Sequence, residues 1–331
     1  MPEPPQVYTK TMALLIDPAR WPAHGTVFSH LISDSSLQEL HSFARAQGIS
    51  ERAFDRDHYD VPAHLCPQLI DAGAQPVSGS ELTRRLHASG LRVPLKERPE
   101  KIRKGLLVRW GTLAPGAEQL GEDILDRWQE PHRSYHNSAH LLEMLGHATY
   151  LAGNDKLPRA ALLAIWLHDV IYEGKAGADE EASATYARHQ LARHQVAGEG
   201  EIEAVACLIE ATAAHQPPQA QEVLQRAGIR QEHWQIFFDA DLAILAAKTA
   251  RYRRYTTGVR QEYSRVSDDD FRQGRAQVLQ GLLERPSIFT TRLGRSSWEA
   301  RARENIAAEL KELTYSERPC ELSGESKAPE R

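Results

Sequence analysis

The sequence predicts a mainly α-helical protein in which a small α/β domain precedes an all-α helical bundle. A short apolar strand, ALLIDP, stops at Pro18 near the start of the chain. From about residue 105 to 315, apolar residues recur at three- and four-residue spacing, which is the period of buried helices. Alternating β-branched runs are nearly absent from this second region, so we expect it to be all-α.

The α/β domain is predicted over residues 12–95. Ser36 is a good N-cap for a helix that ends at Gly48. Residues 63–91 read as a helix, a short strand and a second helix that ends at Gly90. The following stretch has alternating charges and two prolines, so we place a linker at residues 96–104.

The second domain is predicted over residues 105–315. Its helices are expected around residues 117–129, 137–152, 157–172, 179–195, 200–214, 231–248, 250–265, 268–284 and 297–313. Residues 1–11 read as a disordered extension, which leaves Met1 and Met12 as alternative starts. The polar tail 316–331 is also expected to be disordered.

Composition limits the classes of partner. The net charge of −5 argues against broad binding of nucleic acid or anionic membranes. No signal peptide or membrane span of ~20 apolar residues is evident. The three cysteines are widely spaced, as in a protein of the reducing cytoplasm, and a homo-oligomer is left open.

The pair His168-Asp169 ends the apolar run ALLAIWLHDVIY. An Asp beside a buried helix is rarely left without a partner, and imidazole and carboxylate are both good ligands for a divalent metal. Taken alone, the pair would be explained better by a structural His at a helix C-terminus, where its side chain meets exposed carbonyls. Other metal-ligating residues nearby in space would favour the metal.

Two further segments supply such residues. In SYHNSAH, Asn137 is a good N-cap, so His140 falls in the first helical turn and His136 just before it. In IFFDADLAIL, Asp239 and Asp241 interrupt an apolar stretch, where an ionised carboxylate needs a metal or a cation.

The order of His140, His168-Asp169 and Asp241 resembles that of the HD superfamily of metal-dependent phosphohydrolases, which are helical enzymes. YHNSAH is similar to the YHNxxH signature of the cyclic-nucleotide phosphodiesterases, and DADLAIL is similar to a motif of a predicted bacterial HD phosphohydrolase family. The resemblance covers residues 105–313. It implies that the helical domain is an HD-domain bundle.

The resemblance also implies residue roles. His140, His168, Asp169 and Asp241 would bind a divalent ion, Asp241 would also orient the attacking water, and His136 would donate a proton to the leaving oxygen. The ion could be Mn²⁺, Mg²⁺, Fe²⁺ or Zn²⁺. HDVIYEG stands where the phosphodiesterases have HDVDHPG, so a second histidine of their motif is missing.

Several residues are candidates for a second metal or for the substrate, each with an ordinary structural alternative. His215 precedes two prolines and could instead cap its helix, and Arg133 could instead pair with Glu130. The other candidates are Glu180 and Glu181, which could be first-turn acids, and Asp239, which could support a ligand. We expect Arg260, Glu262 and Tyr263 to lie on a solvated helix face.

The expected function is therefore hydrolysis of a phosphoester or phosphoanhydride bond in a nucleotide or related phosphorylated small molecule, by metal-activated water with His136 as proton donor. Two alternatives remain. One is a di-iron oxygenase of the HD fold, which would need additional histidines. The other is a metal-bound nucleotide sensor without turnover.

The N-terminal region resembles a bacterial domain of unknown function through MALLIDPxRWPAHG, FSHLISD and FDRDHYDVP. It contains an unusual number of polar residues for a small unit, and its segment DRDHYD (residues 55–60) could bind a metal or a nucleotide or simply be a polar loop. The polar residues concerned are Asp17, His24, His30, Asp55, Asp57 and His58.

Overall fold

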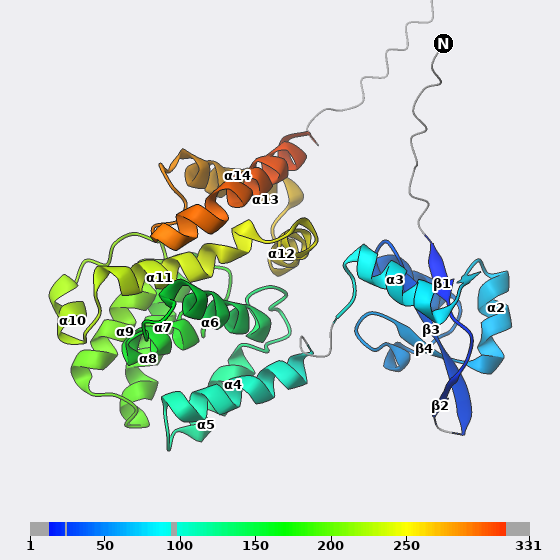
Figure 1. Cartoon of the computed structure of the whole chain (residues 1–331), viewed down its shortest axis with the longest axis horizontal. Coiled ribbons are helices and arrows are strands. Elements are labelled where there is room, and N and C mark those ends of the chain that lie inside the picture. The colour runs from blue at the N-terminus through cyan, green and yellow to red at the C-terminus, as the bar shows by residue number, and fades with distance from the viewer. Residues whose placement is uncertain (1–12, 24, 94–97, 316–331) are drawn as a thin grey trace, which may run out of the picture. The chain divides into compact units, whose positions relative to one another are not determined.

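The computed structural model describes residues 13–23, 25–93 and 98–315 (Figure 1). The chain divides into two compact units between Arg98 and Pro99. The extension and tail predicted to be disordered lie outside the described residues, as does His24.

The first unit is a mixed sheet with helices, which confirms the predicted α/β class. Its strands are β1 (Leu14–Ile16), β2 (Trp21–Ala23), β3 (Thr26–Ser33), β4 (Tyr59–Pro62) and β5 (Gln75–Pro76). The long strand β3 pairs antiparallel with β1, β2 and β4, whereas β5 runs parallel to β1. Of these strands the sequence predicts only those at β1 and β5.

Helices cover both faces of this sheet. They are α1 (Leu37–Ala46), α2 (Cys66–Asp71) and α3 (Gly79–Ser89), with short 3₁₀ turns at Glu51–Ala53 and Ala63–Leu65. Because side chains alternate along a strand, Ile16 and Leu31 pack with α1 and α2, and Leu15 and Ile32 pack with α3. As predicted, the Ser36 hydroxyl caps α1 by accepting from the Glu39 N–H.

The second unit is all-helical, as predicted. Its helices are α4 (Pro99–Leu113), α5 (Glu118–Arg127), α6 (Ser138–Ala152), α7 (Arg159–Leu167), α8 (Ala178–Arg193), α9 (Glu199–Thr212), α10 (Gln221–Arg226), α11 (Gln231–Leu242), α12 (Thr249–Glu262), α13 (Asp268–Glu284) and α14 (Arg292–Tyr315). A 3₁₀ turn, Ala243–Ala246, continues α11. No helix in the described ranges has the length and apolar character needed to cross a lipid bilayer.

The first helix of this unit differs from the sequence prediction. Residues 99–104, which we expected to belong to a linker, form the first turns of α4. Pro99 suits the first helical position, and Ile102, Leu106 and Trp110 follow at four-residue spacing and are buried. Several charged residues stand between these three, so the four-residue apolar spacing is hard to recognise in the sequence.

Two cores fill the helical unit. The larger core includes α7, of which every residue from Leu163 to Leu167 is buried, and it lies against α6, α9 and α11. The smaller core joins α12, α13 and α14 around Phe289. The green helices α6 and α7 and the yellow-green α11 lie together in Figure 1, and all three carry residues of the candidate site.

Candidate metal centre

Helices α6, α7 and α11 bring the predicted ligands together. The Asn137 side chain accepts from the Ala139 N–H and caps α6, which fixes His140 in its first turn. His168 is the C-cap of α7, and Asp241 lies in the last turn of α11. Since α6 packs against both α7 and α11, residues separated by a hundred positions meet in one place.

The side chains of His140, His168 and Asp241 offer ligand atoms that all lie within 4.8 Å of one another. Nε2 of His140 is 3.2 Å from Oδ1 of Asp241, and Nε2 of His168 is 3.8 Å from the same oxygen. Oδ2 of Asp169 lies 3.2 Å from Nε2 of His168. The four residues that the family resemblance picks out therefore converge.

The two histidines present the nitrogen that a metal would need. Nδ1 of His168 donates to the Ile165 carbonyl, so Nε2 keeps its lone pair in the neutral ring. Nδ1 of His140 lies 3.1 Å from the Tyr135 hydroxyl. Both Nε2 atoms are buried, and although each lies 3.2 Å from a carboxylate oxygen, neither makes a well-aligned hydrogen bond with any described residue. Because a buried polar atom is rarely left unsatisfied, this arrangement fits a bound cation.

The electrostatics of the cluster favour positive charge. Burial alone would lower the pKa of His168, but the Asp169 carboxylate outweighs it and raises that pKa to about 9. Burial would raise the pKa of Asp241, but His140, His215 and His168 hold it well below its ordinary range. Burial would also raise the pKa of Asp169, but the neighbouring His168 outweighs it and lowers that pKa to about 2. Buried anionic carboxylates that face imidazole nitrogens are suited to a divalent ion.

His215 joins the cluster from the residues that follow α9. Its Nε2 lies 3.0 Å from Oδ2 of Asp241, the oxygen that does not face His140. Its backbone has φ 47°, in the left-handed region that residues other than glycine seldom adopt. Such strain is tolerated where the surroundings fix it, and here it directs the ring at a candidate ligand.

His136 is held by a residue that the sequence analysis assigned to a solvated face. Nδ1 of His136 lies 2.8 Å from Oε2 of Glu262, and Oε1 of Glu262 accepts the backbone N–H groups of Tyr135 and His136. The Tyr172 hydroxyl also donates to Glu262, and its ring stacks on His136 at 4.2 Å. The Glu262 side chain is 2% exposed, so the expectation of a solvated face is wrong for this residue. The sequence does not show the burial of Glu262, because an acid at the end of an amphipathic helix such as α12 has the same pattern whether it is buried or exposed.

Arg133 lies beside the cluster, but its buried guanidinium is held by backbone carbonyls and by Glu130. Its guanidinium donates to the carbonyls of His136, Asp169 and Val170, and its Nε donates to Glu130. These bonds satisfy carbonyls just past α7, which explains why the helix ends at Leu167 rather than at the expected residue 172. Because the Arg133 side chain is fully buried and does not line the pocket, Arg133 supports the loop that carries Asp169 and does not face a substrate.

Asp239 points away from the ligands, although it is only two residues from Asp241. Its carboxylate accepts from the backbone N–H and the hydroxyl of both Thr290 and Thr291. It is fully buried. Residues two apart on a helix differ by about 200° in direction, so Asp239 anchors the segment before α14 and Asp241 faces the cluster.

The acidic residues of α8 separate into different roles. Asp179 is buried and accepts the N–H groups of Glu173 and Lys175, which shapes the loop after His168-Asp169. Glu180 accepts the Gly177 N–H and lines the pocket that contains the cluster. Glu181 is exposed and lines a different surface hollow, so the structure does not bring it to the cluster.

The cluster opens into a pocket of about 480 Å³. His136, His168, Asp169 and Asp241 line it, together with His215. Aromatic side chains and basic side chains complete its walls: Tyr172, Tyr255, Tyr263, Phe271, Lys175 and Arg275. A space of this size accommodates a small molecule.

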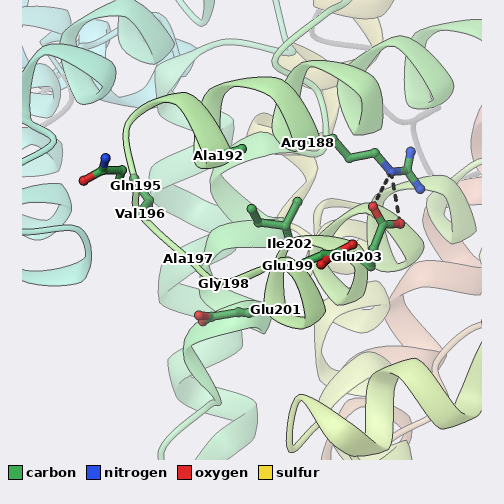
Figure 2. A pocket seen from close by; sticks show the side chains of 10 residues that line it. All are labelled: Arg188, Ala192, Gln195, Val196, Ala197, Gly198, Glu199, Glu201, Ile202 and Glu203. Atoms are coloured by element: carbon green, nitrogen blue, oxygen red, sulfur yellow. Dashed lines mark hydrogen bonds and ion pairs between the residues drawn. The ribbon is translucent and has the colours of Figure 1, made fainter.

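A second pocket, of about 660 Å³, lies between the end of α8 and the start of α9 (Figure 2). Its walls contain none of the predicted site residues. The Arg188 guanidinium is paired with Glu203, as the dashed lines in Figure 2 show, and also with Glu210. Of these two pockets in the helical unit, the one at the His-Asp cluster is therefore the candidate site.

Comparison with protein families finds a match within the N-terminal unit. Residues 14–89 match the family model described as "Protein of unknown function (DUF4031)". This match confirms the N-terminal resemblance. Comparisons of the chain with curated proteins and with solved structures found no match.

Proposed function

We propose that the helical unit is a metal-dependent phosphohydrolase of the HD type. The substrate would be a nucleotide or a related small molecule with a phosphoester or phosphoanhydride bond. The observation that carries this proposal is the convergence of His140, His168 and Asp241 with two buried imidazole nitrogens that lack well-aligned hydrogen bonds. Asp169 beside them completes the ligand set that the family resemblance implies.

A divalent ion held by His140, His168, Asp169 and Asp241 would supply an activated water and neutralise charge on the phosphate. His136 lines the same pocket with Nδ1 engaged by Glu262, which leaves Nε2 to donate a proton to the leaving oxygen. Burial alone would lower the pKa of His136, but Glu262 and the Asp169 and Asp241 carboxylates raise it. A raised pKa keeps the donor protonated near neutral pH.

The pocket walls support a nucleotide-sized substrate. Tyr263 and Phe271 offer aromatic surface on which a base could stack, and Lys175 offers a positive charge for a phosphate. A volume of about 480 Å³ lies within the ordinary range for small-molecule sites.

The test is product release from a panel of cyclic, mono-, di- and triphosphate nucleotides with Mn²⁺, with metal content measured on the same samples. We expect turnover of at least one class by the wild type, loss of bound metal and activity in Asp169→Ala, and a loss of ~10²-fold or more in His136→Ala with the metal retained. His189→Ala, which removes an exposed histidine of α8, is the matched control and should keep full activity.

Two outcomes would overturn the proposal. Tight nucleotide binding with no turnover on any substrate would indicate a sensor. Two irons per chain together with oxygen consumption would indicate an oxygenase.

A further inference from the structure

A second histidine-carboxylate cluster lies in the N-terminal unit. His30 stands on β3, Asp60 stands directly opposite it on β4, and His58 precedes Asp60 by two residues. Because side chains alternate along a strand, His58 and Asp60 share a face of the sheet, and the register adds His30 to that face. Both strands, β3 and β4, are labelled in the blue part of the first unit in Figure 1.

The ligand atoms of these three residues converge. Nε2 of His58 is 3.4 Å from Oδ1 of Asp60, and Nε2 of His30 is 4.0 Å from the same oxygen. All three offered atoms lie within 4.8 Å of one another. The two imidazole rings meet edge to face with their centroids 5.0 Å apart, so both Nε2 atoms approach one small space.

Each histidine is oriented by its own buried carboxylate. Nδ1 of His30 lies 2.9 Å from Oδ2 of Asp17, and Nδ1 of His58 lies 2.7 Å from Oδ1 of Asp57. A carboxylate can only accept, so each Nδ1 carries the hydrogen and each neutral ring leaves the Nε2 lone pair free. This carboxylate-histidine arrangement is the usual outer support of a metal-ligating histidine.

The supporting carboxylates are themselves fixed. The other oxygen of Asp17 accepts the His30 backbone N–H at 2.6 Å, and the second oxygen of Asp57 accepts the Val93 N–H at 2.6 Å. Their side chains are 6% and 1% exposed. A pair of histidines that served only to fill space would not need two buried acids that hold their Nε2 atoms toward one point.

We propose that His30, His58 and Asp60 bind a divalent transition-metal ion, with Zn²⁺ as the expected ion. Two imidazoles and one carboxylate suit a borderline cation rather than Ca²⁺ or Mg²⁺. Three protein ligands leave one tetrahedral position for water or an exogenous ligand, and the Asp60 side chain is 48% exposed, so this position is accessible to solvent. The site is formed within the first unit and does not depend on the cluster in the helical unit.

The test measures metal binding by the full chain. Wild type, His58→Ala, Asp60→Ala and His168→Ala are dialysed against Zn²⁺ and then against metal-free buffer, and zinc per chain is determined by mass spectrometry. Co²⁺ is used in parallel because a tetrahedral site gives it a strong visible absorption. We expect His58→Ala and Asp60→Ala each to bind one zinc ion per chain fewer than the wild type. A double variant that combines His58→Ala with His168→Ala should bind one zinc ion fewer than His168→Ala alone.

Two further variants make the result specific. His64→Ala removes an exposed histidine of the same unit and should retain the full zinc content. Asp57→Asn keeps the ligands but weakens the support of His58, so the zinc affinity should fall by ~10- to 100-fold. Asp60→Ala changes a half-exposed side chain, and circular dichroism checks that it stays folded. Unchanged zinc content and affinity in folded Asp60→Ala and His58→Ala would overturn the proposal.

Discussion

Nδ1 of His136 lies 2.8 Å from Oε2 of Glu262, although 126 positions separate the two residues. The other oxygen of the same carboxylate holds the backbone N–H groups that lead into α6. One buried acid on α12 thus fixes both the ring of the proposed proton donor and the turn that carries it. Glu262 is a positioning residue that acts through His136.

Replacing Glu262 by Gln should lower kcat and shift its pH dependence. The raised pKa of His136 means that the proton-donating form is present below that pKa and is lost as pH rises through it. Without the Glu262 charge, the pKa of His136 should fall, so the basic limb of the kcat profile should move to lower pH and kcat at pH 8 should fall by ~10-fold or more. The measurement is kcat against pH for both proteins on the substrate found with Mn²⁺.

The exposed Glu304 provides the control for this substitution. Glu304→Gln should leave the profile of the wild type unchanged. If Glu262→Gln lowers kcat equally at all pH values, Glu262 has only a structural role.

The sequence singled out His168, Asp169 and Asp241 because they interrupt apolar helical runs, and the family resemblance added His140 to them. His168, Asp169 and Asp241 are polar groups where a core residue is expected, and such an anomaly is visible without a structure. Glu262 and Arg133 were not assigned their roles, since they sit among other charged residues and only the packing of distant segments shows their partners. That these residues bind a metal remains a prediction.

The N-terminal cluster illustrates the same limit for strands. The sequence singled out His30 and the segment DRDHYD, which contains His58 and Asp60, but it did not predict β3 and β4, so it did not place His30 beside that segment. Strand pairing depends on contacts far apart in the chain, whereas a helix is defined by its own period. The helical unit could therefore be predicted in more detail than the sheet.

Substitution of Asp239 should lower the stability of the fold, whereas substitution of Asp241 should remove the metal. Asp239→Ala removes four hydrogen bonds and leaves two backbone N–H groups without an acceptor, so the free energy of unfolding should fall by about 3 kcal/mol. Asp241→Ala should abolish metal binding and activity. Urea denaturation and metal analysis on both variants give the comparison.

Each of these two variants is the control for the other. Folded Asp239→Ala should keep its metal at temperatures well below its melting point. Loss of metal in Asp239→Ala and retention in Asp241→Ala would show that the assignment of the two acids is reversed.

Arg133→Lys should reduce stability and leave substrate affinity unchanged. The guanidinium satisfies the carbonyls of His136, Asp169 and Val170, and a single ammonium group cannot reach all three in that planar geometry. We expect a loss of about 2 kcal/mol in the free energy of unfolding and a lower kcat, because the loop carrying Asp169 is loosened. Thermal denaturation and steady-state kinetics test this. A rise in KM with kcat and stability unchanged would instead assign Arg133 to the substrate.

Gly121 on α5 should not tolerate a methyl group. A Cβ atom there would overlap the indole of Trp110, which is buried and donates from Nε1 to the Ala117 carbonyl. Because neither α4 nor the indole can move without disturbing the core, Gly121→Ala should lower the free energy of unfolding by about 2 kcal/mol. Gly281 lies exposed in the last turn of α13 with open space around it, so Gly281→Ala should raise the free energy of unfolding by about 0.5 kcal/mol through helix propensity. Urea denaturation followed by tryptophan fluorescence distinguishes the two, and equal stability of both variants would contradict the close packing of α4 on α5.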